Sequence, residues 1–109
     1  MTLDRRSYLM IQRIIVNNRF IWNVIIDSHY RKNHSESIND DLILNLVKKL
    51  HGRYQFPEAQ DGKYQYFVTL LEWESKYYRL VWLLEEQENY IGIINAFRDK
   101  KGAQNEFSE

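Results

Sequence analysis

Apolar and polar residues alternate along much of the chain, and the alternation breaks at turn-forming residues. Near the N-terminus, YLMIQRIIV and FIWNVII are rich in β-branched and aromatic residues and are separated by NNR. Asparagine tolerates a positive φ, so Asn17 and Asn18 suit the tight turn of a hairpin. A helix across residues 4–17 stays open as the alternative, because several apolar residues there also fit a helical spacing.

The segment SINDDLILNLVKKLHG has the clearest helical pattern. Ser37 and Asp40 resemble a capping box, and the acidic pair Asp40 and Asp41 suits the start of a helix. Gly52 suits its end. Near that end, His51 fits the role of a cap that compensates the helix dipole. One face collects apolar residues, so we expect the helix to pack on a sheet.

Three further strand-like runs follow: YQYFVTLLEW at 64–73, YYRLVWLLE at 77–85 and YIGIINAFR at 90–98. The links ESK and EQEN are short enough for hairpins, so we expect an antiparallel three-stranded meander. The predicted fold is therefore α+β: an N-terminal hairpin or helices, one central amphipathic helix and the meander on a small antiparallel sheet. Residues 1–101 are expected to form a single domain, with 102–109 as a flexible tail.

Composition limits the classes of function. The chain has 109 residues and no cysteine, which agrees with a reducing compartment, and the sequence contains no long apolar run. We therefore expect a cytoplasmic protein that does not enter a membrane. Fifteen basic and fifteen acidic residues cancel to a net charge of zero, so any attraction to a polyanion must come from local basic segments such as HYRKNH and RDKK.

The basic cluster before the central segment has the residue types that cleave RNA. That reaction needs a base for the 2′-OH proton, an acid for the leaving oxygen, and cations for the phosphorane charge. Histidine, arginine and lysine supply these functions, and the cluster contains His29, Tyr30, Arg31, Lys32 and His34. The competing interpretation is a solvated polar loop.

Metal binding is not expected from this cluster, and no cofactor is expected elsewhere. His29 and His34 are not at the i, i+4 spacing that places two ligands on one face of a helix, and the chain has no Cys-based or H-E-x-x-H pattern.

A second candidate is the end of the last strand, INAFRDKK. Arg98 would carry a guanidinium to the rim of the sheet, where it can hold a phosphate bidentately, and Asn95, Lys100 and Lys101 would add contacts to substrate. The competing interpretation is an edge arginine beside a basic, solubilising end.

The motifs RKNHSESI and YRLVWLLEEQENYIGIINAFR resemble the RelE-like and BrnT-like ribonuclease toxins of bacterial toxin–antitoxin pairs, in the barnase/colicin/RelE-type fold group. The resemblance spans about the last two thirds of the chain. It implies metal-independent RNA cleavage, on free or ribosome-associated RNA, and neutralisation by a cognate antitoxin. By position, Lys32 and His34 match the basic residue and histidine ahead of the helix, and Arg98 matches the arginine of the last strand.

The sequence thus supports two hypotheses. The first is an endoribonuclease toxin in which His29 or His34 transfers protons, Arg31, Lys32 and Arg98 neutralise phosphate charge, and Tyr30 stacks on a base. The second is a non-enzymatic interaction module, such as an immunity protein, an antitoxin-like protein or a phage accessory protein. That module would bind a protein partner through an aromatic face of the sheet, and exposed sheet edges would allow a homodimer.

Overall fold

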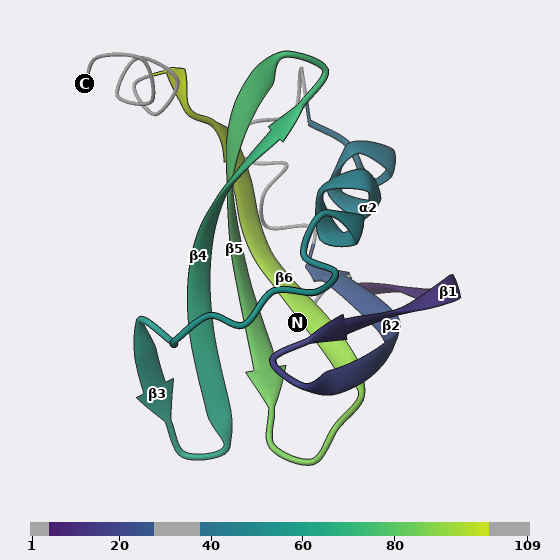
Figure 1. Ribbon diagram of the computed structural model, residues 1–109, viewed down its shortest axis with the longest axis vertical. Helices are drawn as coiled ribbons and strands as arrows, with labels where there is room; N and C mark the ends of the chain where they lie inside the picture. The colour runs from purple at the N-terminus through teal and green to yellow at the C-terminus, as the bar shows by residue number, and fades with distance from the viewer. Residues whose placement is uncertain (1–4, 28–37, 101–109) are drawn as a thin grey trace.

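The computed structural model describes residues 5–27 and 38–100, which form one curved sheet around a short helix (Figure 1). Strands make up 62% of this part of the chain. The elements are β1 (Arg5–Val16), β2 (Arg19–Asp27), α2 (Asp40–Lys48), β3 (Ala59–Asp61), β4 (Tyr64–Trp73), β5 (Lys76–Glu85) and β6 (Tyr90–Arg98).

The sheet has the strand order β1-β2-β6-β5-β4-β3. Its neighbours run antiparallel except β2 and β6, which run parallel with Ile25 opposite Gly92. The predicted α+β class, with a small antiparallel sheet, is therefore wrong: the protein is mostly β, with a six-stranded mixed sheet and one short helix in the part described. Local periodicity gave no sign that the N-terminal hairpin joins the sheet of the C-terminal strands.

The N-terminal segment is the predicted hairpin and not the alternative helix. Asn17 and Asn18 turn the chain with φ values of 52° and 61°, the left-handed conformation that asparagine tolerates. β1 and β2 pair from Arg5 opposite Asp27 to Val16 opposite Arg19, with a register irregularity between Leu9 and Ile14. This bulge bends the edge strand β1.

Helix α2 is shorter than the predicted segment and begins later. Its N-cap is Asn39, whose side-chain oxygen accepts a hydrogen bond from the backbone N–H of Leu42 at 2.9 Å. The predicted cap, Ser37, lies outside the described residues. Gly52, with φ of 85°, lies three residues after Lys49, the C-cap. No helix within residues 5–27 and 38–100 has the length and apolar character needed to cross a membrane.

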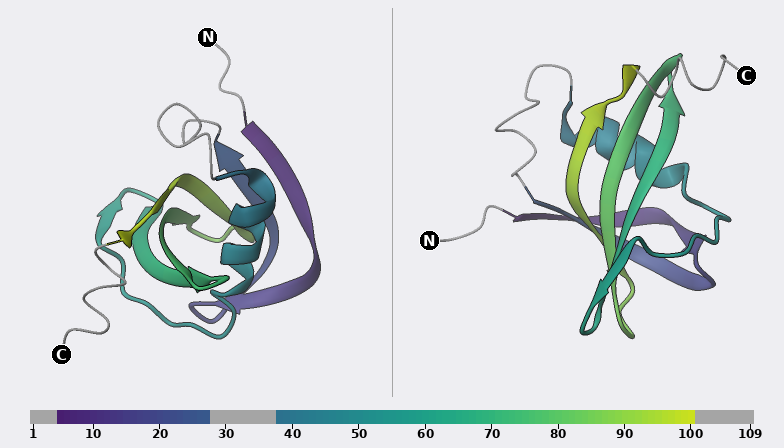
Figure 2. Two further views of the ribbon diagram at one scale, coloured as in Figure 1. Left: turned by 90° about the horizontal axis from the view of Figure 1, so that it is seen from above. Right: turned by 90° about the vertical axis from the view of Figure 1, so that its left-hand side faces the viewer.

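The hydrophobic core lies between α2 and the concave side of the sheet, which curves around the helix (Figure 2). Leu42, Ile43, Leu46 and Val47 form the buried face of α2. From the sheet, Phe67 and Trp82 stack with their ring centroids 4.1 Å apart. These two aromatic residues therefore stabilise the core and are not available to a ligand.

A chain of hydrogen bonds runs from this core to the hairpin turn and joins β5, β4, the loop after α2 and the β1–β2 turn. The indole N–H of Trp82 donates to the hydroxyl of Thr69 at 2.9 Å, and that hydroxyl donates to the side-chain oxygen of Gln55 at 2.7 Å. The backbone N–H of Gln55 in turn donates to the side chain of Asn17, in the hairpin turn, at 2.8 Å. Because Trp82 and Thr69 are buried, water cannot replace the hydrogen bond between them.

We predict that Thr69→Val destabilises the protein by about 1–3 kcal/mol, because it leaves the buried indole N–H of Trp82 without its acceptor. Thr69→Ser keeps the hydroxyl and should cost clearly less. Urea denaturation followed by tryptophan fluorescence measures both values, and equal losses for the two variants would show that the hydroxyl is unimportant.

A second polar cluster links the end of β5 to the start of β6 and to Lys63, the residue before β4. The carboxylate of Glu85 accepts a hydrogen bond from Tyr90 at 2.5 Å and lies 3.0 Å from the ammonium of Lys63. The hydrogen bond from Tyr90, together with the Lys63 interaction, lowers the pKa of Glu85 below its ordinary value of 4.5. Burial, together with the hydrogen bond to Glu85, raises the pKa of the Tyr90 phenol.

This cluster predicts a pH-dependent stability. A carboxyl group with a lower pKa in the folded state stabilises the fold above its unfolded pKa, and the contribution is lost as the pH falls through the folded pKa. Glu85→Gln should therefore destabilise the protein at pH 7, and its difference from the wild type should shrink as the pH falls below 4.5. Urea unfolding at pH 7 and at a pH below 4.5 tests this. Glu72→Gln, a change at an exposed carboxylate, is the control. A difference independent of pH would contradict the assignment.

Candidate functional site

The first turn of α2 is fixed at one end of the sheet. Asp40 forms a two-point ion pair with Arg6 of β1, at 2.8 Å between Nη2 and Oδ1 and 2.5 Å between Nε and Oδ2. Tyr8 donates a hydrogen bond to the same carboxylate, and this bond raises the pKa of the Tyr8 phenol. Arg6 lies opposite Ile26, near the C-terminal end of β2. The helix therefore begins near the end of the sheet at which β2 finishes.

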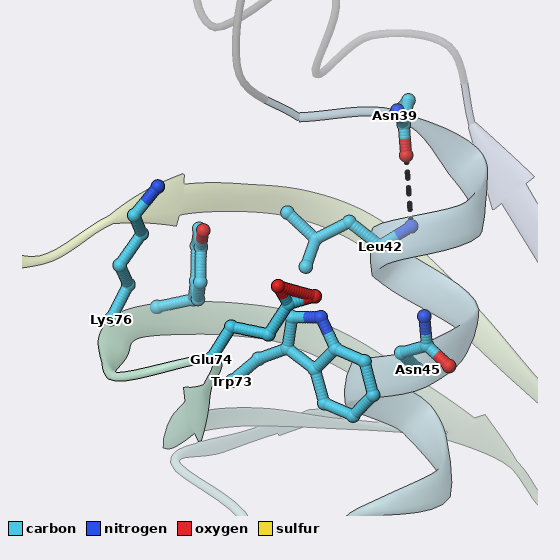
Figure 3. Close-up of a pocket in the computed structure, with 7 residues that line it drawn as sticks. Asn39, Leu42, Asn45, Trp73, Glu74 and Lys76 are labelled. Atoms are coloured by element: carbon cyan, nitrogen blue, oxygen red, sulfur yellow. Dashed lines mark hydrogen bonds between the residues drawn. The ribbon is translucent and has the colours of Figure 1, made fainter.

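A cavity of about 270 Å³ lies between this part of α2 and the β4–β5 turn. Figure 3 shows Leu42 and Asn45 on the helix, across from Trp73 at the end of β4 and Glu74 in the turn, with Asn39 at the N-cap hydrogen-bonded to the N–H of Leu42. The full lining is Asn39, Leu42, Asn45, Trp73, Glu74, Lys76 and Tyr78. The walls combine two amides, a carboxylate, an ammonium, a phenol and an indole, so the cavity offers polar and charged contacts beside aromatic rings.

The β4–β5 turn that forms one wall has a tight geometry. Glu74 and Ser75 both have positive φ values, 51° and 66°, which is the conformation of a two-residue hairpin turn. Trp73 ends β4 with its ring 5.8 Å from the ammonium of Lys49, and Lys76 begins β5. The turn thereby holds the charged side chains of Glu74 and Lys76 at the cavity.

Arg98 ends β6 and is not among the residues that line this cavity. Its strand partner is Tyr78, which is buried and lines the cavity. Side chains of directly opposed residues lie on the same face of a sheet, so the exposed Arg98 lies on the face that also carries Tyr78 and α2. The neighbouring arginine, Arg79, is already in an ion pair with Asp99 at 2.5 Å.

The other predicted site residues are placed differently. Asn95 lies opposite Val81, and strand alternation puts it on the face away from Arg98; its side chain accepts a hydrogen bond from the N–H of Ala96 at 2.9 Å. Lys100 is exposed just beyond β6. The remaining candidates lie outside the described residues: His29, Tyr30, Arg31, Lys32, His34 and Lys101.

Sequence reasoning missed most of the cavity. The sequence predicts Glu74 and Lys76 only as parts of the hairpin link ESK, and Tyr78 only as part of the strand-like run 77–85. Alternation correctly predicts which face of β5 is buried, but it does not show that the buried face ends at a cavity. A charged turn directly after Trp73 was the one available signal.

No group of three or more potential metal ligands occurs among the residues that the structure describes. His51 accepts a hydrogen bond from the backbone N–H of Ile15 at 3.0 Å through Nδ1. It therefore ties β1 to the chain after α2.

A further cavity of about 310 Å³ lies on the face of the sheet opposite α2. Tyr64, Tyr66 and Tyr90 line it, with Arg5 and Asp27 at its edge. A Cβ at Gly92 would come within 2.9 Å of Leu83, so this glycine lets Leu83 pack closely over β6. These tyrosines belong to the aromatic residues of the sheet considered for a protein partner. No family model, no curated protein and no solved structure matches the chain.

Proposed function

We propose that the protein is a metal-independent endoribonuclease whose site lies where α2 begins and β6 ends. One observation supports this proposal: a residue close in sequence to the histidine segment and the strand partner of Arg98 line the same cavity. Asn39, two residues after the segment 28–37, lines it, and so does Tyr78, the strand partner of Arg98. Only three residues separate His34 from Ile38 in the sequence.

The parallel pairing of β2 and β6 supports this arrangement. Parallel strands finish at the same end of a sheet, so Asp27, which precedes the histidine segment, points toward the end where Arg98 lies. The ion pair of Asp40 with Arg6 keeps the start of α2 at that end as well. Asp27 and Asn39, which flank residues 28–37 in the sequence, therefore lie toward the same end of the sheet; Asn39 lines this cavity, and Asp27 lines the one on the opposite face.

The chemistry assigns a role to each group. His29 or His34 removes the 2′-OH proton, the 2′-oxygen bonds to phosphorus, and the bond to the 5′-oxygen breaks as a second acid protonates it. Arg31, Lys32 and Arg98 neutralise the charge on the phosphorane oxygens, and Lys76 adds a cation at the same mouth. Tyr78 and Glu74 are further groups for proton transfer, and Trp73 offers a ring on which a base can stack.

The resemblance to RelE-like and BrnT-like toxins also supports a proposal for the substrate and for the partner. It implies RNA as the substrate and a cognate antitoxin as the partner that neutralises the enzyme. A net charge of zero fits a site in which a few placed cations, and not the charge of the whole surface, attract the phosphate.

We predict that Arg98→Ala lowers the rate of RNA cleavage by about 100-fold, because it removes a cation that stabilises the transition state. Lys76→Ala should lower the rate in the same direction, and the double variant His34→Ala/Arg98→Ala should show no cleavage. The assay follows a labelled single-stranded RNA with EDTA present throughout.

Arg53→Ala is the matched control, since Arg53 is an exposed cation after the C-terminal end of α2. Circular dichroism verifies that each variant is folded. Full cleavage by the double variant would overturn the site, and no cleavage by the wild type on any RNA tested, with growth unaffected by its expression, would overturn the function.

A further inference from the structure

The outer face of the β1–β2 hairpin exposes a group of large apolar side chains. We call it the hairpin patch; its members are Leu9, Ile11, Ile15, Phe20 and Trp22. Ile11 is fully exposed, and Leu9 is 74% exposed. Ile15 and Phe20 lie directly opposite each other on the two strands, so their side chains share one face. Contiguous apolar surface of this kind usually marks a site of interaction.

A guanidinium lies across the patch. The guanidinium carbon of Arg13 lies 4.6 Å from the ring centroid of Trp22 and 5.8 Å from that of Phe20. Stacking of this kind holds the arginine against the aromatic rings while leaving its charge available. Tryptophan and arginine are the residue types that most often dominate the affinity of protein interfaces.

The same stretch of β1 also lines a cavity of about 560 Å³. Tyr8 to Ile14 form one side, and Leu44, Lys48 and His51 form the other. The bulge between Leu9 and Ile14 creates this shape, because the intervening residues have no register partner on β2. Protruding apolar side chains and an apolar hollow thus occur side by side on one edge of the sheet.

Cations prevail among the charged side chains of this edge, where Asp40 pairs with Arg6. β1 carries Arg5, Arg6 and Arg13 and no carboxylate, and Lys48 adds a further cation to the cavity lining. Arg6 is engaged by Asp40, but Arg13 and Lys48 border the hollow. A binding segment that places carboxylates here would gain attraction and orientation.

A second copy of the chain fits this edge poorly. Beyond Arg13 the edge is covered, since the N–H of Ile15 donates to His51 and its carbonyl accepts from Gly52. Antiparallel pairing of the open edge, Arg5 to Arg13, with itself would place Arg5 opposite Arg13 at both ends of the pairing. Like charges directly opposite each other destabilise a strand pair.

We propose that the hairpin patch and the adjoining cavity bind an acidic segment of another protein. Apolar side chains of that segment would fill the hollow between β1 and α2 and cover Ile11, while its carboxylates meet Arg13 and Lys48. This binding surface is separate from the proposed nuclease cavity, because no residue lines both.

The test is a selection of random peptides displayed on phage against the full-length protein, followed by synthesis of one enriched peptide. The enriched peptides should combine Asp or Glu with large apolar residues. Ile11→Glu and Arg13→Glu should each weaken binding of the synthetic peptide by at least about tenfold. Phe56→Glu is the matched control, because Phe56 is another exposed aromatic residue, and it should bind as the wild type does.

Three outcomes would overturn the proposal: no enrichment of acidic peptides, enriched peptides that bind Ile11→Glu as tightly as the wild type, or concentration-dependent self-association that Ile11→Glu abolishes. The last, measured by sedimentation velocity, would identify a second copy as the occupant. RNA cleavage by Ile11→Glu, measured in parallel, separates the two sites, since this variant should lose the peptide and keep any nuclease activity.

Discussion

The parallel pairing of β2 with β6 is the constraint on which the rest of the structure depends. It joins strands from opposite ends of the chain, from Asn23 opposite Tyr90 to Ile26 opposite Ile93. The backbone N–H of Trp22 also donates to the carbonyl of Asn89 at 2.8 Å, which fixes where the pairing begins. Without this pairing the hairpin and the C-terminal strands would be two small sheets, each with an exposed edge. With it, one sheet curves around α2 and encloses a single core.

Local features of the fold could be predicted from the sequence, and the long-range ones could not. Asn17 and Asn18 identified a turn, and the apolar face of SINDDLILNLVKKLHG identified a helix, because both effects act over a few residues. The predicted fold class was wrong because the parallel pairing of β2 with β6 is specified by contacts between residues far apart in the chain. The short strand β3, made of the exposed residues Ala59 to Asp61, carries no apolar pattern and gave no signal.

The residues considered for the candidate site likewise fall into those that the sequence could predict and those that it could not. Arg98 could be proposed from the sequence because a cation at the end of a strand is visible there, and its role stays a prediction. Tyr78, Glu74 and Asn39 could not be proposed in this way, since they form a site only when the β4–β5 turn meets the first turn of α2. Asn95 shows the reverse case: it is near Arg98 in the sequence, yet strand alternation places it on the other face. The chemical character of each side chain could be predicted from the sequence, whereas which side chains lie close together depends on the topology of the sheet.

The order of synthesis gives the β2–β6 pairing a further consequence. Strand β2 leaves the ribosome long before β6, so the edge of β2 that will later pair with β6 has no partner during that interval. Val24 and Ile26, fully buried in the finished fold, are then next to an open row of backbone donors and acceptors. Such edges invite pairing with other chains. During synthesis, the N-terminal hairpin is therefore the part of the growing chain that is most prone to misassembly, until β6 has been made.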